Sequence, residues 1–161
     1  PEMKSTGEAI GYDRTLTRAL YKALQASGMK LQNYGTVLAT IADRDKEEAL
    51  PLIRRFYRLG FNIEATAGTA TFLKENGIRT HVLGKISDGS HEILDSIRSG
   101  YVSYIINTRS IHSSVHAQDG AAIRRCAVEN GVTVFTSLDT VRVLLDVLEE
   151  TTLAVSTIHA E

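Results

Sequence analysis

The sequence of 161 residues has few of the residue types that mark several functional classes. It contains no tryptophan and only 6% aromatic residues, which disfavours a stacking platform for single-stranded nucleic acid. The formal net charge is −1 and no basic stripe stands out, so we expect neither nucleic-acid nor membrane binding. No apolar run is long enough to span a bilayer and no secretory signal is visible, which predicts a cytoplasmic protein.

Cysteine and proline are also scarce. The single cysteine, Cys126, excludes an intrachain disulfide, and it has no nearby ligand-type residues that would suggest a zinc site. Helical spacing groups it with Ile123 and Ala127, which indicates a reduced, buried thiol. The two prolines form no proline-rich linker, and the length suits one domain with a sizeable core.

Short β-branched runs alternate with segments of helical periodicity along most of the chain. The expected strands are 36–41, 61–65, 80–83, 101–106 and 132–135, and the expected helices are 16–24, 45–59, 68–76, 91–99, 120–130 and 138–149. Residues 1–12 have no periodic apolar face and are expected to be extended. The alternation predicts an α/β fold, a three-layer αβα sandwich with a five-stranded parallel sheet and helices on both faces.

The residues that follow the expected strands should meet at one edge of this sheet, because right-handed crossovers bring the carboxyl ends of the strands together. These residues include hydroxyls, small residues and cations: Lys46, Thr66, Gly68, Thr69, Lys85, Asn107, Thr108 and Arg109. Gly68 would let the backbone approach a ligand closely, and the following helix N-terminus would supply free N–H groups and a favourable dipole. Lys46 and Lys85 would add charge. The combination predicts a phosphate site.

Each of these residues also has a purely structural interpretation. A Thr-x-Gly-Thr turn is often only a helix cap, and Lys46 could be a solvated side chain among acidic neighbours. His112 and His116 have the spacing of a metal pair but lie in a serine-rich segment without a third ligand, so no metal site is expected. Arg124 and Arg125 are expected on a solvated helix face or in a subunit contact. No catalytic residue is predicted.

Several segments resemble the end of a carbamoyl phosphate synthetase large subunit. PEMKSTGEAIG at residues 1–11 looks like the segment that closes its second ATP-grasp half, which implies a boundary between a tail at 1–12 and an allosteric domain at 13–161. The segments that resemble this last domain are DK at 45–46, GFNIEATAGTATFL at 60–73, YIINT at 104–108 and IRR at 123–125. The resemblance implies a methylglyoxal-synthase-like fold.

The resemblance also implies a regulatory function. Family members bind UMP as inhibitor, or IMP or a phosphoribosyl compound such as phosphoribosyl pyrophosphate as activator. By motif position, the ligands fall on Lys46, Thr66, Thr69, Lys85, Asn107 and Thr108, with Thr40 as a further candidate. Arg109 stands where some members have a hydroxyl residue, and its guanidinium would add charge.

The implied partners are the rest of the synthetase large subunit, a glutamine amidotransferase small subunit and homo-oligomer contacts. The implied parent enzyme is a ligase that uses ATP with Mg or Mn, whereas this domain by itself needs no cofactor. The alternative is methylglyoxal synthase, a lyase acting on dihydroxyacetone phosphate. Asp43 and Lys46 keep part of its HDxxK pattern, but Ala42 replaces the histidine. A third alternative is an interaction module without a ligand.

Overall fold

The computed structural model describes residues 9–26, 28–108 and 114–160. The chain divides into two compact units. One unit, Gln32–Arg142, contains the whole sheet. The other contains helix α1 (Ala9–Ala26) and the part of α6 (Leu138–Ala160) that begins at Val143. All the site residues described below belong to the first unit.

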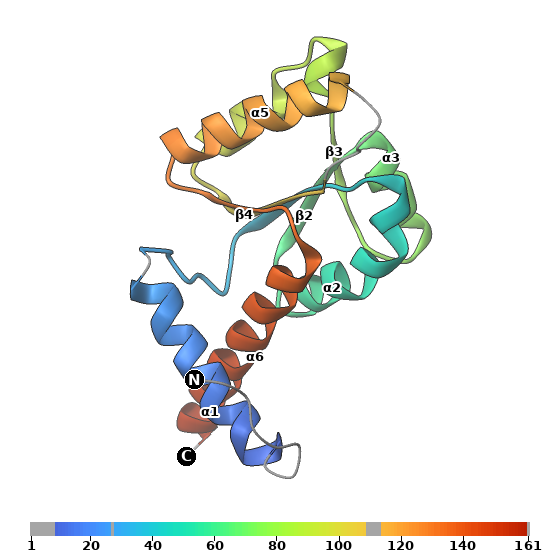
Figure 1. Ribbon diagram of the computed structural model, residues 1–161. Coiled ribbons are helices and arrows are strands. Elements are labelled where there is room, and N and C mark those ends of the chain that lie inside the picture. Colours follow the sequence, from blue (N-terminus) through green and yellow to red (C-terminus); the bar gives the residue numbers. More distant parts are fainter. Residues whose placement is uncertain (1–8, 27, 109–113, 161) are drawn as a thin grey trace. The chain divides into compact units, whose positions relative to one another are not determined.

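The sheet has five parallel strands, as predicted, and the structure gives their order as β3-β2-β1-β4-β5 (Figure 1). Its strands are β1 (Thr36–Thr40), β2 (Asn62–Thr66), β3 (His81–Leu83), β4 (Val102–Asn107) and β5 (Thr133–Phe135). The helices between them are α2 (Lys46–Arg58), α3 (Ala67–Glu75), α4 (Glu92–Arg98) and α5 (Ser114–Glu129), with 3-10 turns η2 (Asp43–Asp45) and η3 (Ile86–Asp88). The predicted αβα class is therefore confirmed.

The strand order places a topological switch point between β1 and β4. From β1 the chain builds outward through β2 to β3, and then returns to the opposite side of β1 to form β4. In open parallel sheets the connections diverge at such a point and leave a crevice outside the carboxyl ends of the strands. Thr40 and Asn107, which end β1 and β4, are paired in register at this crevice.

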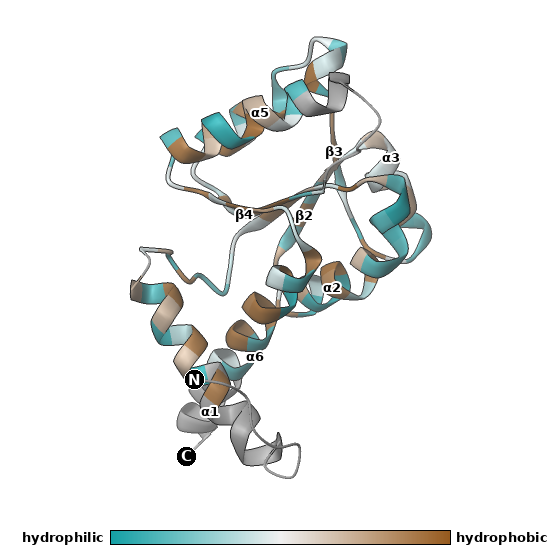
Figure 2. Ribbon diagram, in the orientation of Figure 1, coloured by the Kyte–Doolittle hydropathy of each residue, from teal (hydrophilic) through white to brown (hydrophobic). Residues whose placement is uncertain are grey.

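The two faces of the sheet have different cores. Leu38 and Ile105 lie in register and belong to a buried cluster with residues of α4 and α5, including Ile97 and Ile123. Tyr104 belongs to the opposite face, which α2 covers. Figure 1 shows α5 and α2 on opposite sides of the strands, and in Figure 2 α2 is hydrophobic on one side and hydrophilic on the other.

Four aromatic rings form the core beneath α2. Phe56 contacts Phe61 edge-on at a centroid distance of 5.3 Å, and Tyr104 lies 6.1 Å from Phe56 and 6.1 Å from Phe135. The Tyr104 hydroxyl accepts a hydrogen bond from the N–H of Gln32 at 2.8 Å and donates one to its carbonyl at 2.7 Å. Both hydrogen bonds tie the segment that precedes β1 to the core.

Substitution Tyr104→Phe is expected to destabilise the chain by about 1–3 kcal/mol at neutral pH, because both backbone groups of Gln32 lose their partner. Burial raises the pKa of Tyr104 to about 12. An unfolded tyrosine titrates near pH 10, so the native tyrosine stabilises fully below that pH and loses this contribution as the pH rises toward 12. Urea denaturation should therefore give a parent–variant difference that shrinks above pH 10. A constant difference would contradict the burial argument.

Three local expectations are wrong. Residues 9–12 belong to α1 and are not extended, while Pro1–Glu8 lie outside the described residues. Helix α5 begins at Ser114 and not at 120, so His116 is helical, and His112 lies outside the described part of the chain. Helix α6 continues to Ala160, beyond the expected end at 149. In each case the expected helix was too short, because a glycine or a run of polar residues was taken as its end.

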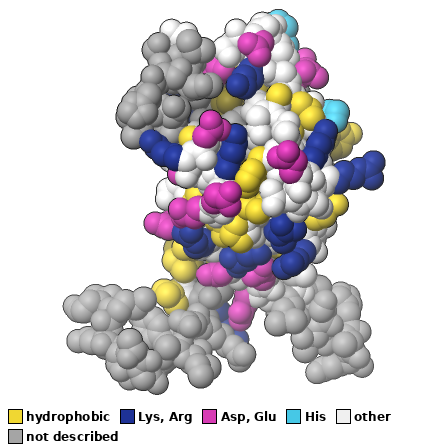
Figure 3. Space-filling view, turned by 90° about the vertical axis from the view of Figure 1, so that its right-hand side faces the viewer, with side chains coloured by type: hydrophobic (Ala, Val, Ile, Leu, Met, Phe, Trp, Pro, Cys, Tyr) yellow, Lys and Arg dark blue, Asp and Glu magenta, His cyan; other side chains and the backbone are white. Residues whose placement is uncertain are grey.

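The described surface is mixed in charge. On the face shown in Figure 3, Lys and Arg side chains are interspersed with Asp and Glu. Across residues 9–26, 28–108 and 114–160, no helix is both long enough and apolar enough to traverse a bilayer.

Candidate functional site

A cavity of about 400 Å³ lies at the carboxyl ends of β1, β2 and β4. Its lining includes eight of the residues predicted from the sequence: Thr40, Lys46, Thr66, Gly68, Thr69, Lys85, Asn107 and Thr108. Arg109, the ninth, lies outside the described residues. The volume is within the usual range for small-molecule sites, about 300–1,000 Å³, and exceeds what a bare phosphate ion needs.

One wall of the cavity is the N-terminus of α3. Thr66 is the N-cap residue but makes no side-chain capping hydrogen bond. The hydroxyl of Thr69 accepts a hydrogen bond from the N–H of Ile41 at 3.2 Å, so it holds the end of β1 beside the helix. The first N–H groups of any helix have no partner within it, and here Thr66, Gly68 and Thr69, at the start of α3, line the cavity. An anion fits such a wall.

Lys46 places its ammonium group at the same wall. It is the first residue of α2, its side chain is only 17% exposed, and it forms an ion pair with Asp43, whose side chain is 95% exposed. Its Nζ lies 3.5 Å from the position that a Cβ on Gly68 would take. A Cβ at Gly68 would thus be in van der Waals contact with the ammonium, which places Lys46 close against the start of α3.

The ends of β1 and β4 form the floor of the cavity. The Thr40 hydroxyl donates to Oδ1 of Asn107 at 2.6 Å. The Thr108 hydroxyl accepts a hydrogen bond from the N–H of Ala42 at 2.8 Å, and its own N–H bonds to the carbonyl of Thr40. Asn107 is 7% exposed, and its Nδ2 has no hydrogen-bond partner within the described part of the chain. The floor is rigid and offers a free donor.

Lys85 completes the predicted set. It precedes η3 as the N-cap residue and lines the cavity, and its carbonyl accepts hydrogen bonds from Asp88 and Ser90. These bonds hold the backbone of the lysine at the cavity wall.

Sequence reasoning missed the wall formed by α5. Asp119, Gly120, Ile123 and Arg124 also line the cavity. Arg124 was expected on a solvated face or in a subunit contact. It is partly buried within the chain itself, and its Nη1 is buried without a hydrogen-bond partner among the described residues. Positions 120, 123 and 127 share a helical face with i, i+3, i+7 spacing, and this pattern was a usable signal.

The cavity also contains two carboxylates among its described lining residues. Asp43 is paired with Lys46, and Oδ2 of Asp119 accepts a hydrogen bond from the N–H of Ser87 at 3.2 Å. Ala42 lines the cavity where a histidine would complete the HDxxK pattern.

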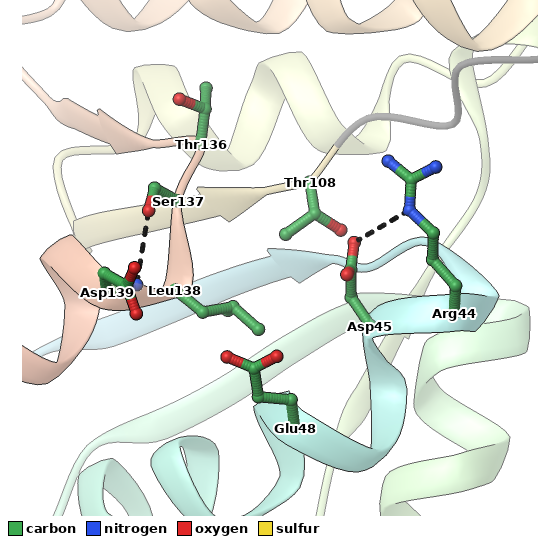
Figure 4. A pocket seen from close by; sticks show the side chains of 8 residues that line it. All are labelled: Arg44, Asp45, Glu48, Thr108, Thr136, Ser137, Leu138 and Asp139. Carbon is green, nitrogen blue, oxygen red and sulfur yellow. Dashed lines mark hydrogen bonds and ion pairs between the residues drawn. The ribbon is translucent and has the colours of Figure 1, made fainter.

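A second depression, of about 480 Å³, adjoins the cavity on the β5 side and shares Arg44 and Thr108 with it (Figure 4). Figure 4 shows the Arg44–Asp45 ion pair beside Thr108, with Glu48 and Asp139 facing the opening. Arg142 binds both Glu48 and Asp139, and its hydrogen bond with Glu48 raises the pKa of Arg142. Two arginines therefore pair with three carboxylates at this depression, which leaves no excess of positive charge among these five side chains.

The described residues provide no group of three or more His, Cys, Asp or Glu side chains that could hold a metal ion. Cys126 is buried in the cluster beneath α5, where its thiol lies 3.8 Å from the carbonyl of Leu94.

The chain matches a protein-family model. The family described as MGS-like domain matches residues 48–136, which is just over half of the chain. The matched region runs from α2 through β5 and includes the α3, β4 and α5 walls of the cavity.

Proposed function

The chain belongs to the MGS-like domain family, and we propose that it is the regulatory domain of a carbamoyl phosphate synthase large subunit. In this proposal it binds a nucleotide or phosphoribosyl effector, such as UMP, IMP or phosphoribosyl pyrophosphate, and performs no chemistry itself. The supporting observation is the convergence of eight residues, predicted from separate segments of the sequence, on one cavity.

The wall formed by Lys46 and α3 is suited to the phosphoryl group. The ammonium of Lys46 beside Gly68 supplies a charge, and the first N–H groups of α3 supply donors. Because the Thr69 hydroxyl already bonds to Ile41, we assign the phosphate contact at Thr69 to its backbone N–H. Lys85 adds a second cation from the other side of β2.

The remaining part of the cavity is suited to a sugar and base. Asn107 offers its free Nδ2 at the floor, and Ile93 and Ile123 supply apolar surface. A ligand the size of a nucleoside monophosphate would use the full volume of about 400 Å³, whereas a triose phosphate would fill only part of it.

A methylglyoxal-synthase-type lyase is the second candidate, and the observation in its favour is the presence of Asp43 and Asp119 in the cavity. A lyase needs a carboxylate free to remove a proton beside the bound phosphate. Here Asp43 is neutralised by Lys46, and Asp119 caps the backbone at Ser87. This arrangement favours binding over turnover.

Calorimetric titration with UMP, IMP and phosphoribosyl pyrophosphate tests the proposal, with an assay of inorganic phosphate release from dihydroxyacetone phosphate as the second arm. We expect saturable binding of at least one effector and no phosphate release. Ligand at a hundredfold excess over its dissociation constant should also raise the free energy of unfolding by about 2.7 kcal/mol. Phosphate release would identify the lyase, and no binding would favour an interaction module.

Regulation would operate by a population shift. An effector that binds one arrangement of the domain and the synthetase body more tightly changes the active fraction by its differential affinity, typically about 1–3 kcal/mol. The body would supply the ATP and Mg or Mn sites, and a glutamine amidotransferase subunit would supply ammonia. We also propose that this domain takes part in contacts between copies of the large subunit.

A further inference from the structure

Two unpartnered donors lie together at the α5 side of the cavity. Nδ2 of Asn107 and Nη1 of Arg124 are both buried and have no hydrogen-bond partner among the described residues. The Asn107 Oδ1 is held by the Thr40 hydroxyl at 2.6 Å, which aims the amide nitrogen away from β1. A buried donor without a partner is costly, and a buried guanidinium nitrogen more so.

Gly120 lies where the two donors meet. A Cβ on Gly120 would be 3.1 Å from Nδ2 of Asn107 and 3.3 Å from Nη1 of Arg124, so both nitrogens pack closely against Gly120, and all three residues line the cavity. Both groups can only donate at these atoms. A ligand atom that bonds to either nitrogen from the cavity must therefore be an acceptor, such as an oxygen, since an amino group would meet only donors.

This donor pair lies apart from the phosphate wall. The phosphate wall is built by α2 and α3, and α2 packs on the sheet face that carries Tyr104. Arg124 belongs to α5, which packs on the opposite face with Leu38 and Ile105. The cavity therefore extends across the edge of the sheet between β1 and β4, with cationic groups toward both of its ends.

We infer that Arg124 is a ligand-binding residue, and that it and Asn107 together bind an acceptor oxygen on the organic part of the phosphorylated effector. This inference rests on the proposed function, since it takes the phosphate to be held at α3. The ligand class is an organic phosphate with a carbonyl or hydroxyl oxygen opposite its phosphoryl group. The bound oxygen removes the cost of two buried, unpartnered donors.

The test compares the parent chain with Arg124→Gln, using UMP, ribose 5-phosphate and inorganic phosphate as calorimetric probes. Arg125→Gln is the matched control, because Arg125 is the adjacent residue on α5 and is exposed. We expect Arg124→Gln to weaken UMP binding by about tenfold, since a hydrogen bond from a charged donor is lost. Inorganic phosphate should bind both proteins equally, and Arg125→Gln should bind all three probes as the parent does.

Ribose 5-phosphate locates the acceptor. If its affinity falls as that of UMP does, the oxygen belongs to the sugar, and if only UMP weakens, it belongs to the base. Unchanged UMP binding in Arg124→Gln would overturn the inference, as would an equal loss for inorganic phosphate, which would place Arg124 at the phosphate wall. A parent chain that binds none of the probes would instead refute the proposed function. Melting of the ligand-free variant at or above the parent temperature confirms that folding is intact.

Discussion

Substitution Lys46→Met lowers the affinity for UMP by about a hundredfold in our account. The side chain of Lys46 is mostly buried, and its ammonium lies beside Gly68 at the start of α3. A phosphoryl group bound there would accept hydrogen bonds from the ammonium and from the first N–H groups of the helix. A hydrogen bond between charged groups contributes about 1.5–3 kcal/mol, and 1.4 kcal/mol corresponds to a factor of ten. Methionine keeps the apolar stem, so calorimetric titration reports the loss of charge.

The control for this experiment is Lys74→Met, because Lys74 is exposed in the last turn of the same α3 helix. It should leave UMP binding unchanged. The free energy of unfolding should differ little between Lys46→Met and the parent, since the partner Asp43 is almost fully exposed and can be solvated alone. Equal UMP affinity in Lys46→Met and the parent would show that Lys46 does not bind the phosphoryl group.

Substitution Phe56→Ala is expected to destabilise the chain by about 3–5 kcal/mol, a large share of the stability of a typical domain. Phe56 is fully buried and contacts both Phe61 and Tyr104, so its removal leaves a cavity beneath α2. Urea denaturation monitored by circular dichroism measures the effect. Tyr57→Ala, at an exposed position of the same helix, should change stability by about 0.5 kcal/mol or less.

If Phe56→Ala and Tyr57→Ala lower the free energy of unfolding by the same amount, the aromatic cluster is not the core that orients α2. That result would also matter for the site, because α2 begins at Lys46 and carries this residue to the cavity. A destabilised but folded Phe56→Ala chain should regain stability with UMP in proportion to the logarithm of ligand concentration.

The sequence was sufficient to predict the fold class, because each strand is a short β-branched or apolar run and each helix has a periodic face. It also placed Thr66 and Asn107 near the carboxyl ends of their strands, and the structure puts both at the last strand position. The order of the strands was not predictable in this way, since periodicity describes one element at a time. The pairing of Thr40 with Asn107 depends on that order.

The site was only partly predictable for the same reason. The α5 wall was missed because ligand residues were sought only just after each strand, and the residues of α5 that line the cavity lie within a helix. Arg124 was expected on a solvated face or in a subunit contact, and only its position in the fold reveals a buried nitrogen that has no hydrogen-bond partner among the described residues. The Thr69 hydroxyl was expected to be a ligand donor, but it bonds to the backbone of Ile41, a contact between residues 28 positions apart. Such long-range contacts leave no local signal.

A crystal structure of the chain with UMP tests the central claim most directly, because it locates the phosphorus atom. The account predicts the phosphoryl group between the ammonium of Lys46 and the first N–H groups of α3, with the nucleoside extending past Asn107 toward Arg124. A nucleotide bound at any other surface, or a phosphoryl group beside Arg124 with Lys46 uninvolved, would contradict it.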